Sequence, residues 1–257
     1  MQNTQNFYSL KFSGANCHYS LLVNDMPVFH FFDRGIMATR FPINHLILKS
    51  GEQAVKIQVY PQSEEYLSRG SRLEVMVEES SGNNYEITEI IAGHKTPSFE
   101  KKEKFYEYSF TFDAQVPYEL PGWSKSEILK YPEKTFPKIV EHYRYLHAVL
   151  KNKRFDQFYE LLEKKNQEFD IAYNSDSETS RKEWLQVIDQ IEDSKMQLAD
   201  FPEDLDVQYY ANGRVVALFQ KNFKPVLFFE NKEEGTTYDM YLYLQKVPKE
   251  MRFEIIR

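Results

Sequence analysis

Residues 206–220 read DVQYYANGRVVALFQ, and this stretch decides the fold of the C-terminal half. Apolar and aromatic residues flank Asn212 and Gly213 on both sides, which predicts two strands joined by a tight turn. Both residues tolerate the positive φ that the central positions of a type I′ turn require, and the twist of that turn matches antiparallel strands. A two-residue loop also fixes the register. The expected pairs are Tyr209 with Val216, Tyr210 with Val215, and Ala211 with Arg214.

Three amphipathic helices are predicted before this hairpin. The first begins near Thr135, a residue type that can cap a helix, and the second begins near Phe155. In the third, Ser180 and Glu183 have the spacing of a capping box, and Pro202 ends the segment. Apolar residues at helical spacing form the expected buried faces, which are Ile139, Val140, Tyr143, Leu146 and Leu150; Phe158, Tyr159, Leu162, Phe169 and Tyr173; and Trp184, Val187, Ile188, Ile191 and Leu198.

Further strands are expected after the hairpin, at residues 226–230, 238–245 and 253–256. Three helices followed by an antiparallel meander make an α+β domain. This element order resembles that of nuclear-transport-factor-2-like (NTF2-like) and cystatin-like domains, in which helices pack on a curved sheet.

The sequence of the N-terminal half predicts strands throughout. No window before residue 120 supports a long amphipathic helix, and short apolar stretches alternate with turn residues at 13–16 and 24–27. In AVKIQVY, residues 54–60, the apolar side chains recur with the period of two that is typical of a half-buried strand. Such short strands indicate an antiparallel β-sandwich or barrel. The expected strands include 7–12, 17–24, 28–32, 54–60, 73–77, 85–91 and 105–112.

A segment rich in turn residues separates the two halves. The stretch VPYELPGWSKSEILKYPE, residues 116–133, contains three prolines and a glycine, which interrupt regular structure. We therefore expect a β-sandwich domain at 1–120, a linker at 121–134 and an α+β domain at 135–257.

Composition and charge narrow the classes of function. The net charge is −7, which disfavours binding to nucleic acid because phosphate contacts need clustered Lys and Arg, and which favours a basic partner. The N-terminus lacks the basic and apolar segments of an export signal. No apolar run approaches the ~20 residues of a membrane-spanning helix. We therefore expect a cytoplasmic protein that binds neither nucleic acid nor a membrane.

The sequence offers few groups for catalysis. Cys17 is the only cysteine, and its neighbour His18 should point to the opposite face of a strand. His142 and His147 are five residues apart, about 140° around a helix, so they do not share a face as metal ligands would. Phosphate-binding loops, dinucleotide fingerprints and nucleophile elbows are absent from the sequence. We therefore expect no catalytic residues, no cofactor and no metal.

The stretch YDMYLYLQ, residues 238–245, has two distinct faces if it forms one strand. One face carries Tyr238, Met240, Leu242 and Leu244 and is expected in the core. The other carries Asp239, Tyr241 and Tyr243, and either the helices cover it or it is open to a partner, since Tyr suits both settings.

Four stretches spread over most of the chain resemble one family. They are NDMPVF at 24–29, PINHLILKSGEQAVKIQVYP at 42–61, YYANGRVVALFQ at 209–220 and FEIIR at 253–257. They are similar to bacterial proteins encoded beside interbacterial toxins of the type VI secretion and Rhs kinds. The resemblance implies an immunity protein that binds its cognate toxin in the cytoplasm and neutralises it by occlusion. Because the shared patterns are turns and strands, the resemblance assigns no site residue.

Candidate contacts follow instead from residue type and expected position. Acidic and Tyr-bearing surfaces would steer and hold a basic toxin. The candidates in expected loops, at strand ends or on the tyrosine face are Glu64, Glu65, Tyr66, Glu78, Glu79, Glu233, Glu234, Asp239, Tyr241 and Tyr243.

The alternative function is a small-molecule-binding protein or enzyme with a pocket in the C-terminal domain. Asp239, Tyr241, Tyr243 and Tyr210 would then line the pocket. A deep pocket with a carboxylate of raised pKa would favour this alternative, whereas a sheet packed solid by the helices would remove it. A third possibility, carbohydrate binding by the N-terminal sandwich, rests on fold analogy alone.

Overall fold

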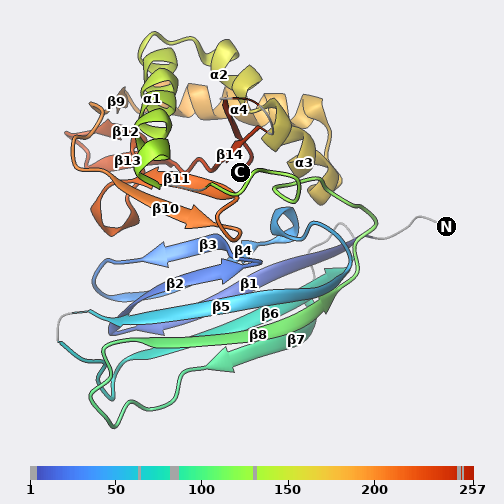
Figure 1. The fold of residues 1–257 in the computed structure, drawn as a ribbon, viewed down its shortest axis with the longest axis vertical. Helices are drawn as coiled ribbons and strands as arrows, with labels where there is room; N and C mark the ends of the chain where they lie inside the picture. The colour runs from blue at the N-terminus through green and yellow to red at the C-terminus, as the bar shows by residue number, and fades with distance from the viewer. Residues whose placement is uncertain (1–4, 63–64, 82–86, 130–131, 248–249, 251) are drawn as a thin grey trace. The chain divides into compact units, whose positions relative to one another are not determined.

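The computed structural model describes residues 5–62, 65–81, 87–129, 132–247, 250 and 252–257. The chain divides into two compact units, residues 1–120 and 121–257 (Figure 1). N-terminal strands are followed by helices and then by further antiparallel strands, which confirms the predicted α+β class.

The first unit consists of two antiparallel sheets, with strand orders β4-β1-β6-β7 and β3-β2-β5-β8. In the described part of the unit the strands are β1 (Asn6–Ala15), β2 (Cys17–Val23), β3 (Met26–Phe31), β4 (Ile36–Pro42), β5 (Gly51–Pro61), β6 (Arg72–Ser81), β7 (Ile87–Lys95) and β8 (Tyr106–Ala114), with a 3-10 helix, η1 (Asn44–Leu46), before β5.

The two sheets pack face to face as a sandwich. Alternate residues of β5 are fully buried, including Val55 and Ile57, as their period of two predicts. Aromatic rings join the sheets, since the centroid of Phe12 on β1 lies 5.9 Å from that of Tyr19 on β2. The core of the first unit therefore lies between the inner faces of its sheets.

The turns of the first unit are shorter than expected. β1 continues through Ala15, and the chain reverses at Asn16 with a φ of 54°, so the turn expected at 13–16 is wrong. Asn24 and Asp25 both have positive φ and join β2 to β3. β4, an edge strand whose side chains are mostly exposed, is not among the expected strands because it carries no regular apolar alternation.

The second unit contains helices and two smaller sheets, with strand orders β10-β11-β14-β15 and β13-β12-β9. The described elements are α1 (Pro132–Lys151), α2 (Phe155–Leu161), α3 (Glu163–Tyr173), α4 (Ser177–Asp193), β9 (Gln197–Leu198), β10 (Asp206–Tyr210), β11 (Val215–Phe219), η2 (Lys221–Phe223), β12 (Leu227–Asn231), β13 (Thr236–Met240), β14 (Leu244–Lys246) and β15 (Phe253–Ile255).

The hairpin register is confirmed, whereas its turn differs from the prediction. Tyr209 pairs with Val216 and Tyr210 with Val215. The first turn, however, is centred on Ala211 and Asn212, whose φ values are 51° and 55°, and the Gly213 N–H donates to the Tyr210 carbonyl at 3.0 Å. β10 ends at Tyr210 and β11 begins at Val215, so the loop is longer than two residues and still leaves the strands in the expected register.

The helices also differ in number and in their ends. The second predicted helix is two helices, α2 and α3, which are separated at Leu162. α4 begins at Ser177, and its cap is Asp176, whose carboxylate accepts from the Thr179 N–H at 2.8 Å. Ser180 does not cap α4 but hydrogen-bonds to Asp170. Leu198, expected at the end of the third helix, lies in β9.

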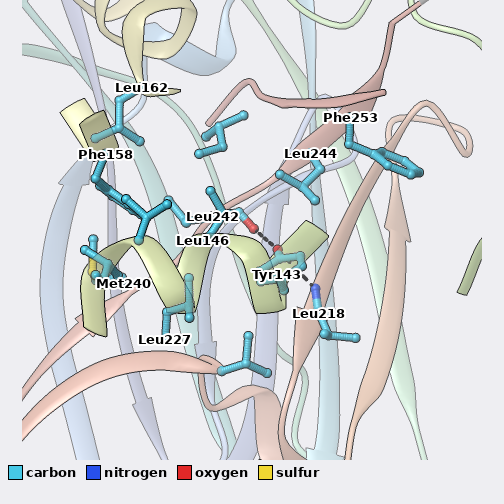
Figure 2. Close-up of a cluster of buried hydrophobic side chains, with 14 of the residues drawn as sticks. Tyr143, Leu146, Phe158, Leu162, Leu218, Leu227, Met240, Leu242, Leu244 and Phe253 are labelled. Atoms are coloured by element: carbon cyan, nitrogen blue, oxygen red, sulfur yellow. Dashed lines mark hydrogen bonds between the residues drawn. The ribbon is translucent and has the colours of Figure 1, made fainter. Parts of the chain in front are cut away.

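The predicted strand at 238–245 is two strands in different sheets. β13 ends at Met240 and β14 begins at Leu244, so the expected single curved sheet is replaced by two. Tyr143 of α1 makes hydrogen bonds to the segment where the chain passes from one sheet to the other (Figure 2). Its hydroxyl donates to the Leu242 carbonyl and accepts from the Leu218 N–H of β11. One buried cluster thus joins α1 to strands of both sheets.

The segment expected to be a linker is counted in the second unit. Trp123 and Leu129 are both buried, and the Leu129 N–H donates to the Gly213 carbonyl at 2.8 Å. α1 already begins at Pro132, before the expected domain start at residue 135.

Candidate functional site

A groove of about 360 Å³ lies within the second unit, between the helices α2 to α4 and the end of β13. We call it the aromatic groove. It is lined by Tyr159, Leu162, Lys165, Asn166, Phe169, Ser180, Glu183, Trp184, Val187 and the run Tyr238–Leu242.

Helical spacing explains why these side chains converge. The residues from α4 are Ser180, Glu183, Trp184 and Val187, at relative positions 0, 3, 4 and 7. The residues from α3 and the residue before it, Leu162, Lys165, Asn166 and Phe169, repeat the same spacing. Residues so spaced lie on one face of a helix. The groove therefore lies between two helix faces, and β13 completes its lining.

The floor of the groove belongs to the hydrophobic core. Leu162, Trp184, Met240 and Leu242 line the groove and are also members of the buried cluster of the second unit. Figure 2 shows Leu162, Met240 and Leu242 within that cluster. A floor held by core packing keeps a binding surface in place before any ligand arrives.

The rings of the groove already hold cations from the chain itself. The Lys165 ammonium lies 4.6 Å from the centroid of the Phe169 ring, and the Arg181 guanidinium lies 4.6 Å from that of Tyr159. Both distances are within the range of a cation–π attraction. Trp184 stacks on Phe158, with 5.7 Å between ring centroids, at the buried side of the same wall.

Two carboxylates and one amine supply the charge of the lining. Glu183 and Asp239 are both exposed. The pKa of Lys165 is lowered to about 8, chiefly by burial and next by the positive charge of Arg257, while Glu183 opposes the change. At neutral pH the lining side chains therefore carry two negative charges and one positive charge, and the positive charge is lost in mild alkali.

One buried donor in the lining has no acceptor. The indole N–H of Trp184 is buried and makes no hydrogen bond to any described residue. Such a donor costs free energy when it is left unpaired, and an unpaired donor beside a groove is a reason to consider a ligand.

The groove brings together two of the predicted contacts, Asp239 and Tyr241. Tyr243, expected on the same face, is not in the lining. It lies past the end of β13 and packs its ring on Tyr210 and Phe219, at 5.7 and 6.4 Å between centroids. Burial raises the pKa of the Tyr243 hydroxyl. Tyr243 is therefore a packing residue of the second unit.

Glu233 and Glu234 lie in the turn between β12 and β13, as expected. Their backbone N–H groups donate to the Asn231 side-chain oxygen at 3.0 and 3.2 Å, and both side chains are exposed. They are close in sequence to β13 but do not line the groove.

Glu65, which is exposed, and Tyr66, which is half-buried, form a small cluster with two lysines in the first unit. Lys104 pairs with Glu65 at 2.7 Å. The ammonium groups of Lys102 and Lys104 lie 5.4 and 5.5 Å from the centroid of the Tyr66 ring. The predicted contact Glu64 lies outside the described residues.

Glu78 is not at a strand end, and that expectation is wrong. It lies inside β6 with only 2% of its side chain exposed, and it pairs with Lys11 and Arg40, each at 3.3 Å. The register shifts between Val77 and Glu78, so two consecutive side chains of β6 are buried. The neighbouring Glu79 is half-buried and accepts a hydrogen bond from the Tyr8 hydroxyl at 3.2 Å.

Cys17 and the histidines do not gather into a site. Cys17 is fully buried, donates to the Arg72 carbonyl, and has its pKa raised to about 11 by burial. His18 packs on Phe32 instead. Within the described residues, no three His, Cys, Asp or Glu side chains are placed to hold a metal ion. In that same part of the chain no helix is long and apolar enough to cross a membrane.

A second, larger groove of about 500 Å³ lies at the C-terminal ends of α1 and α4. Its floor includes Leu150, Ile191 and Phe229, and three lysines stand around it, Lys151, Lys153 and Lys195. None of the predicted contacts lines it. Lys153 is already paired across it with Glu192, at 3.6 Å.

Comparison of the chain with protein-family models, with curated proteins and with solved structures found no match in any of the three.

Proposed function

We propose that this chain binds a cognate protein toxin in the cytoplasm and neutralises it by occlusion, as an immunity protein. The observation that carries the proposal is the aromatic groove, whose lining includes Asp239 and Tyr241 together with Trp184, Tyr159 and Tyr238. Tyr and Trp are the residues that most often anchor protein interfaces, because they combine a large apolar face with a polar edge.

Two further observations support a protein partner. Tyr241 is 44% exposed although Met240 and Leu242 on either side of it are buried. An exposed ring next to a fixed core can be covered by a partner without rearrangement of the chain, which lowers the entropic cost of binding. The net charge of −7 favours a basic toxin and would increase the rate of association with it.

Co-expression with a candidate cognate toxin tests the proposal. Cells that produce both proteins should survive, and cells that produce the toxin with the Tyr241→Ala variant should not. Glu160→Gln is the matched control, because Glu160 is an exposed residue of α2 outside the groove. Cell death with both wild-type proteins present would exclude the immunity function.

A small-molecule ligand is the second candidate, and the unpaired indole N–H of Trp184 favours it. A neutral ligand carbonyl that reached the base of the groove could accept that hydrogen bond. A thermal-shift screen of small metabolites tests it. The Val187→Trp variant would fill the groove. A compound that raises the melting temperature of the wild type but not of this variant supports the function. A screen that finds no such compound is evidence against it.

A further inference from the structure

We propose that the aromatic groove is a receptor for a single cationic side chain, preferentially arginine, that the bound protein inserts beside Glu183 and Asp239. This inference rests on the proposed function, because it specifies which part of the partner the groove receives.

Glu183 and Asp239, the two carboxylates of the groove lining, form no ion pair with any described residue, whereas neighbouring carboxylates do have partners. Asp156 pairs with Arg181, Asp170 accepts from Ser180, and Glu168 pairs with Arg257. By contrast, neither Glu183 nor Asp239 lies within 4 Å of a cationic group in the described part of the chain. The groove therefore offers two carboxylates whose charge the chain itself does not neutralise by direct pairing.

The lining of the groove is also rich in aromatic rings. The rings of Tyr159 and Phe169 each contact one cation of the chain at 4.6 Å, so aromatic rings of this lining do take part in cation–π contacts. Tyr238, Tyr241 and Trp184 supply further ring surface in the same groove. A cation between rings and carboxylates gains both the cation–π and the Coulomb attraction.

Arginine fits this lining better than lysine. Its guanidinium is planar, stacks on rings, and can donate two parallel hydrogen bonds to a carboxylate, whereas the lysine ammonium is a point charge that holds its water more strongly. The groove volume of about 360 Å³ is at the low end of small-ligand pockets. It therefore suits one side chain and not a long segment.

The two carboxylates disfavour an anionic guest. With Lys165 charged, the lining still carries one net negative charge, and the ammonium of Lys165 is turned to the Phe169 ring. An anion would meet both free carboxylates, and like charges at contact distance repel.

Two short peptides that differ at one heavy atom, a guanidinium nitrogen replaced by oxygen, test the inference. The probes are acetyl-Gly-Arg-Gly-amide and the same peptide with citrulline, which keeps the shape of arginine and removes its charge. Titration into the full chain is followed by the indole N–H signal of Trp184 in proton–nitrogen NMR spectra. We expect the arginine peptide to shift this signal saturably and to bind at least fivefold more tightly than the citrulline peptide.

Variants of the two carboxylates show where the arginine peptide binds. Glu183→Gln and Asp239→Asn should each weaken binding of the arginine peptide about two- to fivefold, as expected for the loss of one partly exposed ion pair. The double variant should weaken its binding about tenfold. Glu160→Gln should leave the affinity unchanged. Equal binding of both peptides, or no binding of either, would overturn the inference.

The outcomes also separate this inference from the proposed function. If the toxin is bound by the Glu183→Gln/Asp239→Asn double variant as tightly as by the wild type, but not by Tyr241→Ala, the immunity function stands and the arginine site is excluded. If the arginine peptide binds as expected while the wild type fails to bind or neutralise the toxin, the groove is a cation site and the immunity function is excluded.

Discussion

Arg257 and Glu168 form an ion pair in which both side chains are almost completely buried. The guanidinium Nη1 lies 2.7 Å from the Glu168 Oε2, and the side chains are 3% and 5% exposed. The other carboxylate oxygen accepts from the Gly122 N–H at 3.0 Å, and the guanidinium lies 5.1 Å from the Trp123 ring centroid. This pair joins three segments of the second unit: the residues before α1, the helix α3 and the end of the chain.

Removal of one partner of this pair should be costly. Glu168→Ala leaves a buried guanidinium without its counter-charge, and such a change costs about 3–5 kcal/mol of unfolding free energy. Urea denaturation followed by tryptophan fluorescence measures it, because both tryptophans, Trp123 and Trp184, belong to the second unit. Lys232→Ala removes a pair whose lysine is 81% exposed, and it should change stability by less than about 1 kcal/mol. Equal effects of the two changes would contradict the assigned role of the buried pair.

Tyr143→Phe tests the bonds that hold α1 to the strand crossing. The change removes the hydroxyl that donates to the Leu242 carbonyl and accepts from the Leu218 N–H, both of which are buried. A buried group left unpaired costs about 1–3 kcal/mol, so we expect a loss of at least that size. Tyr145→Phe is the matched control on the same helix, because Tyr145 is 44% exposed. A loss below about 0.5 kcal/mol for Tyr143→Phe would show that water or another group replaces the hydroxyl.

Stability of the second unit should increase in mild alkali. The pKa of Lys165 is about 8 in the folded chain and about 10.4 in an unfolded one, so between these values the unfolded state binds more protons. Folding therefore becomes more favourable as the pH rises from 8 towards 10. The charges that act on Lys165 are Arg257, which lowers its pKa, and Glu183 of α4, which raises it.

Urea midpoints at pH 7, 8, 9 and 9.5 measure this effect for the wild type and for Lys165→Met. The rise should be smaller in the variant, which has no group to deprotonate. Ionisation of tyrosines above pH 10 acts in the opposite direction, because burial raises the pKa of Tyr143 and Tyr243. An identical pH dependence in wild type and variant would contradict the assignment to Lys165.

Acid should destabilise the second unit through His142. Burial lowers the pKa of His142 to about 4 from an ordinary value of about 6.5, so the unfolded state binds more protons between these two values. The stability that depends on neutral His142 is therefore fully present above pH 6.5 and is lost as the pH falls towards 4. His142→Phe should flatten this dependence when tryptophan fluorescence follows the second unit. A variant that loses stability as steeply as the wild type would place the titrating group elsewhere.

The sequence predicts strands best where local chemistry dictates them. The register of β10 and β11 follows from the residues on either side of Asn212 and Gly213, although the turn itself uses Ala211 as well. The buried face of Met240, Leu242 and Leu244 also follows from alternation. These features depend on neighbours in sequence, so one chain is enough to find them.

The groove could not be predicted because it depends on two interruptions. The helix break at Leu162 sets the start of α3, and the break after Met240 moves Tyr243 away from Asp239 and Tyr241. Neither position carries glycine or proline, so the sequence offers no local signal for the break. The sequence predicts Trp184 only as part of the buried face of a helix and Glu183 only as part of a capping box. The spacing of 0, 3, 4 and 7 that the groove residues of each helix share is also the signal of ordinary core packing.

The contribution of the aromatic groove to toxin binding is measured by the dissociation constant of the complex for the wild type, Tyr241→Ala and Glu160→Gln. If the aromatic groove is the contact, Tyr241→Ala should weaken binding by about 2 kcal/mol, which is roughly thirtyfold, as for the loss of an aromatic anchor, and Glu160→Gln should bind like the wild type. The urea midpoint of Tyr241→Ala should equal that of the wild type. If such a folded variant binds the toxin as tightly as the wild type does, the aromatic groove is not the contact.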